Sequence, residues 1–321
     1  MTNLKNLKFI DLFAGIGGFH LGLHSLEADC VYANEWEKNA QEVYFENFGL
    51  LPDNDITQVS EKNIPRHDIL CAGFPCQAFS VSGKRLGFED TRGTLFFDVA
   101  RIISHHHPKV VFLENVKNFF NHDSGKTYAV VKQTLENLGY DVYSKILRSS
   151  DFGVPQARER LYIVCFKKEM GIKFDFPKPL EKTISVSSIL EKKVSEEFFI
   201  QREDIDIYKS ESDVKNLRSP AQIGKINKGG QGERIYSIHS VGPTISANGG
   251  GAAAKTGAYL VNERIRKLTP KECLRMQGFP EEFQMNVPKN IAYKLLGNSV
   301  SVPVIEEIAK SIAYALAHST K

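Results

Sequence analysis

Short apolar runs recur through the first half of the 321-residue chain and constrain its fold more than any other feature. They are dense in Val, Ile and Leu and are bounded by Gly, Asn, Asp or Pro, as is typical of strands buried on both faces of a parallel sheet. The runs are LKFIDLF, ADCVYANE, HDILCAGF, KVVFLENV and RLYIVCF. Helical patterns such as YAVVKQTLENLGY lie between some of them. The sequence therefore predicts an α/β fold with a mostly parallel, doubly wound sheet.

The pattern changes after FDFPKPL, where two prolines interrupt regular structure. The following segment contains the glycine-rich stretches KGGQGER and SANGGGAAAKTG, which favour loops. Helical patterns return in TPKECLRMQGF, NIAYKLLGNS and PVIEEIAKSIAYALAHS. We therefore expect a catalytic and cofactor-binding domain at 1–185, a smaller domain of strands and loops at 186–272, and C-terminal helices at 273–321 that pack back on the first domain.

Charge is distributed unevenly, although the net charge is only +3. Residues 186–214 hold four Lys/Arg against eight Asp/Glu, whereas residues 215–275 hold eleven against three. A basic, glycine-rich segment is typical of binding to a polyphosphate backbone. The alternative is that the segment is only a charged face in contact with solvent. The chain begins without a secretory signal and has no apolar stretch of membrane-spanning length, so we expect a cytoplasmic protein. The scattered cysteines favour free thiols.

FIDLFAGIGGF predicts a strand, a glycine turn and a helix start, a combination that can cradle a bound nucleoside. It lacks the G-x-G-x-x-G dinucleotide pattern, because His20 stands where Gly15 and Gly17 would call for a third glycine. Glu35 ends the next predicted strand, where a carboxylate can accept both ribose hydroxyls. Asp55 is a further candidate contact, and a turn or helix cap explains it equally well.

Polar residues follow several of the later predicted strands, which favours a catalytic site at the carboxyl ends of the strands. Cys76 follows the rigid residue Pro75 and leads into a polar stretch that builds no core, which favours a reactive thiol over a packed one. Glu114 ends KVVFLE, where it is either a proton donor or a solvated cap. Arg158 and Arg160 lie two residues apart at the start of a predicted strand, so both side chains face one side. They fit either two guanidinium groups that hold a carbonyl or carboxylate, or a surface ion pair.

FIDLFAGIGGF, NEW, GFPCQAFS, ENV, QARER and GNSV, in this order, resemble the sequence blocks of the bacterial DNA (cytosine-5) methyltransferases over nearly the whole chain. The resemblance implies the S-adenosylmethionine-dependent methyltransferase fold with a smaller, mostly β and loop, target-recognition domain. It implies that Cys76 adds to carbon 6 of cytosine and that Glu114 contacts and protonates ring nitrogen 3. Arg160 would then bind the base carbonyl, and Arg158 would support the same pocket.

The resemblance also implies S-adenosylmethionine as the cofactor, S-adenosylhomocysteine as the product, and no metal. Trp36 and Phe13 would offer flat apolar surface to adenine. The implied cofactor-binding residues are Phe13, Ala14, Gly15, Gly17, Glu35, Trp36, Asp55, Ile56, Pro75 and Asn298.

The implied partner is double-stranded DNA, from which the target cytosine must swing out before a thiolate can reach it. The segment 77–94 would close on that event, and Ser82 would fill the vacated space. Gln231 and Arg234 are the expected base contacts and Thr244 a backbone contact. Asn248 stands where we expect tyrosine from a close relative. The implied function is the modification half of a restriction system, acting within GCGC.

We expect a monomer that binds no membrane, and a cognate endonuclease that shares the site without binding this chain. A non-catalytic DNA-binding module needs none of Cys76, Glu114, Arg158 and Arg160, which argues against that class. A tRNA cytosine methyltransferase is a closer rival, against which the basic, glycine-rich segment favours duplex DNA. A dehydrogenase is the weakest rival because of His20.

Overall fold

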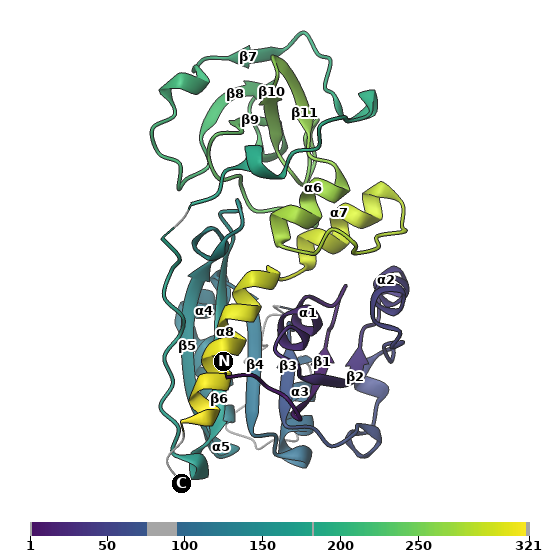
Figure 1. Cartoon of the computed structure of the whole chain (residues 1–321), viewed down its shortest axis with the longest axis vertical. Coiled ribbons are helices and arrows are strands. Elements are labelled where there is room, and N and C mark those ends of the chain that lie inside the picture. Colours follow the sequence, from purple (N-terminus) through teal and green to yellow (C-terminus); the bar gives the residue numbers. More distant parts are fainter. Residues whose placement is uncertain (1, 76–94, 182, 319–321) are drawn as a thin grey trace. The chain divides into compact units, whose positions relative to one another are not determined.

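The computed structural model describes residues 2–75, 95–181 and 183–318. These residues divide into two compact units. The first unit comprises Met1–Leu147, Glu159–Pro177 and Ile305–Lys321, and the second comprises Arg148–Arg158 and Lys178–Val304. Figure 1 labels their helices and strands. The three-part division at residues 186 and 273 stays a prediction.

The first unit is built on a six-stranded sheet in the order β2-β1-β3-β4-β6-β5. Neighbours among the first four strands pair in parallel, and β6 runs antiparallel to β4. The strands are β1 (Lys8–Leu12), β2 (Asp29–Asn34), β3 (Ile69–Ala72), β4 (Val110–Val116), β5 (Tyr140–Arg148) and β6 (Glu159–Lys167). The predicted α/β class with a mostly parallel sheet is confirmed, and the sequence reading missed β5, which lies at one end of the sheet.

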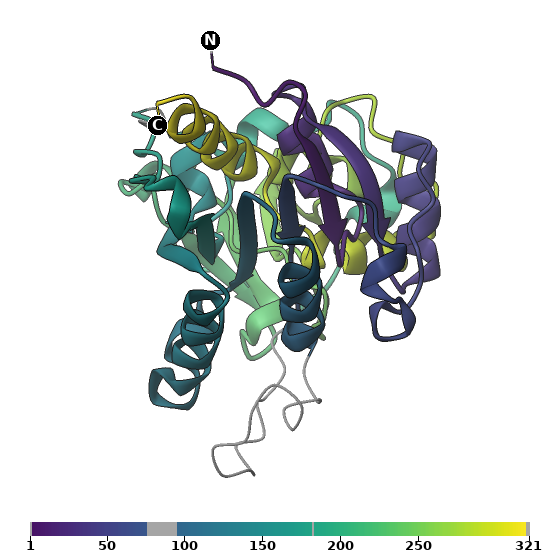
Figure 2. The ribbon, with the colours of Figure 1, turned by 90° about the horizontal axis from the view of Figure 1, so that it is seen from below.

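Helices cover both faces of this sheet (Figure 2). They are α1 (Gly18–His24), α2 (Lys38–Phe48), α3 (Leu95–His106), α4 (Asn118–Asn121), α5 (Lys126–Asn137) and α8 (Val302–Ala317). On one face, Phe19 of α1 packs edge-on against Phe112 of β4 with ring centroids 5.0 Å apart. On the other face, α3 and α5 share a buried apolar cluster with Val111 and Leu113 of the same strand. Successive residues of β4 therefore serve opposite faces, as a doubly wound sheet requires.

The second unit holds a five-stranded sheet in the order β11-β10-β9-β8-β7. Its strands are β7 (Ile205–Ile207), β8 (Gln222–Ile226), β9 (Arg234–Ser237), β10 (Ala258–Val261) and β11 (Arg264–Lys267). It also contains α6 (Pro270–Gln277) and α7 (Lys289–Asn298). A small apolar core of Ile223, Ile226, Ile235 and neighbouring side chains stabilises the sheet.

Candidate active site and cofactor site

The turn after β1 has a backbone shape that its sequence explains. Phe13, Gly15 and Gly17 all have positive φ angles. A Cβ atom on Gly17 would lie 2.2 Å from a ring carbon of Phe48, so only glycine fits there, whereas the same position on Gly15 faces open space. His20 stacks on Phe48, and burial lowers the pKa of its ring to about 3. The residue that breaks the dinucleotide pattern is therefore part of the core beneath the turn.

Glu35 connects this turn to the end of β2. Its buried carboxylate accepts one hydrogen bond from the Gly15 N–H and one from the Glu37 N–H, each at 2.8 Å. Burial raises the pKa of the Glu35 carboxyl above its usual range, although the two N–H donors act in the opposite direction. Each carboxylate oxygen retains a further acceptor site. The side chain is thus held at the carboxyl end of β2, with capacity to accept hydroxyl groups.

Two other candidate nucleoside contacts are Trp36, which follows Glu35 in the sequence, and Asp55, which belongs to a segment that pairs with the end of β2. Trp36 is 75% exposed, so it does not fill the core. A parallel bridge from Asn34 to Asp53, and a hydrogen bond from the Glu35 N–H to the Asp53 carbonyl at 2.8 Å, bring the following segment alongside β2. In that segment Asp55 is exposed and caps a short helix by accepting from the Thr57 N–H at 3.0 Å.

These features fit a nucleoside. The exposed indole of Trp36 and the half-buried ring of Phe13 offer flat apolar surface, and the open space above Gly15 leaves room for a bound group. Ala14 follows Phe13 in the sequence and Ile56 follows Asp55, and both side chains are buried. Within the described ranges, which omit 76–94, no group of three or more His, Cys, Asp or Glu side chains could hold a metal ion.

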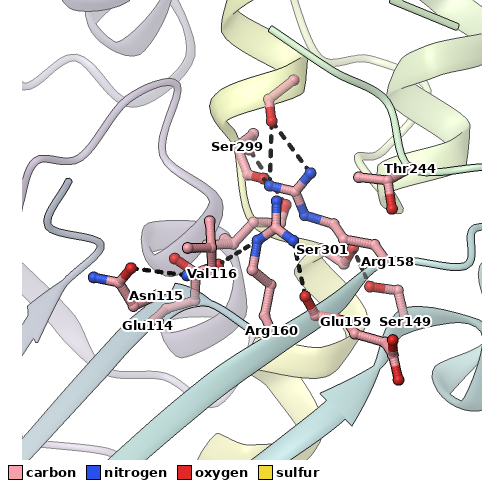
Figure 3. A network of polar contacts seen from close by, with 12 residues as sticks. Glu114, Asn115, Val116, Ser149, Arg158, Glu159, Arg160, Thr244, Ser299 and Ser301 are labelled. Carbon is pink, nitrogen blue, oxygen red and sulfur yellow. Dashed lines mark hydrogen bonds and ion pairs between the residues drawn. The ribbon is translucent and has the colours of Figure 1, made fainter. Parts of the chain in front are cut away.

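A buried ion pair lies where β4 and β6 meet (Figure 3). Arg160 Nε lies 3.1 Å from Glu114 Oε1, and both side chains are nearly buried. In the antiparallel register Arg160 faces Val116, so Glu114 and Arg160 are diagonal neighbours on one face of the sheet. A hydrogen bond from an Arg160 Nη to the Glu159 carbonyl at 2.8 Å further fixes the guanidinium. The pair presents a carboxyl group and a positive charge side by side.

Asn115, which sequence reasoning passed over, connects this pair to the next strand. Its buried side-chain amide donates to the Phe74 carbonyl at 2.9 Å. A Cβ on Gly73 would lie 3.8 Å from Glu114 Oε2, so the residues after β3 run close to the carboxylate. Pro75 is exposed at the end of this segment. The signal in the sequence was a polar side chain at the end of an apolar run. Cys76 and Ser82 lie outside the described residues.

Arg158 belongs to the second unit and has a different set of partners (Figure 3). It is 2% exposed, and its guanidinium donates to the carbonyl groups of Gly297 at 3.2 Å and Ser299 at 2.5 Å. Asn298, between these two residues, is exposed. The predicted catalytic arginine and the predicted cofactor-binding asparagine are therefore close together within one unit.

The candidate DNA-contacting residues of the second unit differ in exposure. Gln231, Arg234 and Asn248 are exposed, as direct contacts require. The half-buried Thr244 donates its hydroxyl to the Ala157 carbonyl at 3.0 Å, so in this structure its hydrogen bond is internal. Among the residues with described structure, no helix is both long and apolar enough to cross a membrane.

Comparison with known proteins gives consistent matches. A family model described as C-5 cytosine-specific DNA methylase matches residues 7–314. The chain is 52% identical over 316 residues to the Type II methyltransferase M.HhaI of Haemophilus parahaemolyticus, covering 98% of this chain and 96% of that protein. It is 43% identical over 321 residues to the Type II methyltransferase M.HaeII of Haemophilus aegyptius, covering 99% and 96%. The S. pombe Dnmt2 methyltransferase structure shares the fold, with a TM-score of 0.74 at 22% identity over 97% of this chain and 99% of that chain.

Proposed function

The chain belongs to the C-5 cytosine-specific DNA methylase family, and from this membership we propose that it methylates carbon 5 of an extruded cytosine at a short site in double-stranded DNA. The expected site is GCGC, and the expected setting is the modification half of a restriction system. The resemblance inferred from the ordered motifs is confirmed, and the family implies use of S-adenosylmethionine. The observation that carries the proposed chemistry is the buried pair of Glu114 and Arg160.

The Glu114 and Arg160 pair suits one edge of a cytosine ring. Carbonyl oxygen 2 and nitrogen 3 are adjacent atoms, and the two side chains are 3.1 Å apart. Arg160 would donate to oxygen 2, and Glu114 would hold a proton at nitrogen 3, so that negative charge entering the ring is neutralised at both atoms. Because both groups are largely withdrawn from water, this stabilisation is stronger than it would be at an exposed site.

Cys76 would supply the nucleophile. Its thiolate adds to carbon 6, a carbon–sulfur bond forms, and the electrons of the 5,6 double bond move into the ring and make carbon 5 nucleophilic. Asn115 and Glu114 support this placement, because one bonds to Phe74 and the other lies beside Gly73, both just before the cysteine. Once carbon 5 carries the methyl group, loss of its proton to water re-forms the 5,6 double bond, the bond between carbon 6 and the Cys76 sulfur breaks, and the thiolate is restored.

When bound, S-adenosylmethionine supplies an electrophilic methyl group for carbon 5. Glu35 would accept its ribose hydroxyls, and Trp36 and Phe13 would cover its adenine. The other residues assigned to this site are Ala14, Gly15, Gly17, Asp55, Ile56, Pro75 and Asn298. Gln231, Arg234, Thr244 and Asn248 would contact DNA, with Ser82 or Gln231 filling the space that the extruded base leaves.

Methyl transfer from labelled S-adenosylmethionine tests this proposal. A duplex containing GCGC should accept label, whereas tRNA and a duplex without the site should not. Cys76→Ala should reduce transfer by at least about a thousandfold, because the ring then lacks its nucleophile. Cys71→Ala is the matched control, since the Cys71 thiol is fully buried in β3 and should be needed only for packing. Substantial transfer by Cys76→Ala, or equal labelling of tRNA, would contradict the proposal.

A further inference from the structure

Arg158 is the centre of a buried polar network in the second unit. Besides Gly297 and Ser299, its guanidinium donates to the Ile245 carbonyl at 3.4 Å. Its own carbonyl accepts from the Ser149 N–H at 2.8 Å, so the backbone of Arg158 is fixed as well as its side chain. These three acceptors are backbone carbonyls from two segments far apart in the sequence. A planar fork of donors can hold several such acceptors at once, which a lysine ammonium cannot do in the same way.

The position of these carbonyls explains why a buried positive charge is stable there. Helix α7 ends at Asn298, and the carbonyls of the last turn of a helix have no partner within the helix. Two acceptors, Gly297 and Ser299, lie at this end, where the helix dipole also favours a cation. Arg158 therefore caps α7 and fixes the backbone on both sides of Asn298.

Gly297 brings a second segment against the same helix end. A Cβ atom on Gly297 would lie 2.2 Å from the Ala247 nitrogen and 2.4 Å from the Ser246 carbonyl carbon, so only glycine permits this contact between main chains. The contacting segment continues directly into the exposed residue Asn248. Arg158 bonds to Ile245 at the start of that segment. The exposed residues Asn298 and Asn248 are therefore carried by backbone that one arginine and one glycine hold together.

Neighbouring polar residues reinforce this arrangement. Gln156 accepts from the Ile245 N–H at 3.1 Å and donates to the Met276 carbonyl at 3.0 Å. Gln277 donates to the Leu296 carbonyl at 2.8 Å. Because these side chains are buried and hydrogen-bonded, the end of α7 has little freedom to move independently of residues 156–158.

We propose that Arg158 is a positioning residue that orients Asn298 for cofactor binding and joins it to the segment bearing Asn248, instead of a group that touches the base. The proposal rests on the proposed function, in which Asn298 contacts S-adenosylmethionine. It separates the two arginines of the QARER motif: Arg160 acts on the substrate beside Glu114, and Arg158 acts through the backbone of α7.

A double-mutant cycle tests this separation. Affinity for S-adenosylhomocysteine can be followed by the fluorescence of Trp36, which is the one tryptophan of the chain. Arg158→Lys and Asn298→Ala should each raise the Kd by about tenfold. Because Arg158 acts through Asn298, the double variant should bind no more weakly than Asn298→Ala alone.

Arg266→Lys is the matched control, because Arg266 is another buried arginine of the second unit, and its described hydrogen bonds go to Glu272 and to the Lys267 carbonyl. It should lower thermal stability and leave the Kd unchanged. Multiplicative effects in the cycle, or a Kd unaffected by Asn298→Ala or by Arg158→Lys, would overturn the positioning role while leaving the proposed function intact. Absence of binding by the unaltered protein would instead overturn the proposed function and this inference with it.

Discussion

At the scale of single residues, the environment of Glu35 changes the properties of an ordinary carboxyl group. Water would keep an exposed glutamate ionised at neutral pH, but burial beside the glycine turn raises the pKa of Glu35. The N–H groups of Gly15 and Glu37 compensate in part by bonding to the charged form. The carboxylate is therefore held in one orientation, and its charge state is more sensitive to mild acid than that of an exposed glutamate.

This sensitivity predicts the pH dependence of cofactor binding. As pH falls, Glu35 takes up a proton earlier than an ordinary glutamate, and the protonated group is a poorer acceptor for ribose hydroxyls. The Kd for S-adenosylhomocysteine should rise by about tenfold between pH 7.5 and pH 5. Glu35→Gln should bind weakly at both pH values with little change between them. Equal affinity of the unaltered protein at pH 7.5 and pH 5 would contradict this assignment.

Sequence reasoning identified residue types more readily than their partners. Trp36 is exposed and Glu35 is buried, and the cofactor-binding roles that the motifs suggested for them stay predictions. The contacts of Arg158 were not predictable, because its acceptors are backbone carbonyls 87 to 141 residues away, which carry no side-chain signal. Asn115 was missed for a related reason, since its partner is the carbonyl of Phe74.

At the scale of elements, a buried ion pair joins β11 to α6. Arg266 donates to both oxygens of Glu272, at 2.6 and 2.8 Å, and neither side chain is appreciably exposed. Glu272 also accepts from the N–H groups of Thr269 and Glu191, so its charge is fully hydrogen-bonded. Removing one partner of such a pair destabilises the fold, because the remaining charge is then buried without a compensating charge.

Breaking this pair should therefore destabilise the second unit strongly. Glu272→Leu leaves the Arg266 guanidinium buried beside an apolar side chain, and we expect a loss of about 3 to 5 kcal/mol in the free energy of unfolding. Denaturant unfolding followed by circular dichroism measures it. Glu196→Ala is the control, because its pair with Arg264 is exposed and its removal should leave the unfolding midpoint unchanged. Similar unfolding midpoints for the two variants would show that the buried pair contributes no more to stability than the exposed pair.

The elements themselves were predictable where their apolar pattern was strong. The runs that became β1, β2, β3, β4 and β6 are continuous and apolar because both faces of those strands are covered. Strand β5 was missed because most of its residues are only partly buried, and its sequence YDVYSKILR mixes polar and apolar side chains. Position at the end of the sheet does not decide this, because β2 lies at the other end and its run ADCVYANE was identified.

At the scale of the whole molecule, the candidate site residues are distributed over two units. The first unit contains the glycine turn, Glu35 and the Glu114 and Arg160 pair, whereas the second holds Arg158, Asn298 and the candidate DNA contacts. The chain crosses between them at residues 158 and 159, within the QARER motif, so that two arginines two residues apart belong to different units.

Bisulfite sequencing of a plasmid propagated with this protein tests the central claim most directly. The account predicts that cytosines at one position of a short recurring sequence, expected to be GCGC, resist conversion, while all other cytosines convert. Cells that express Cys76→Ala should yield fully converted plasmid. Complete conversion with the unaltered, folded protein, or protection of cytosines without regard to sequence, would contradict the account.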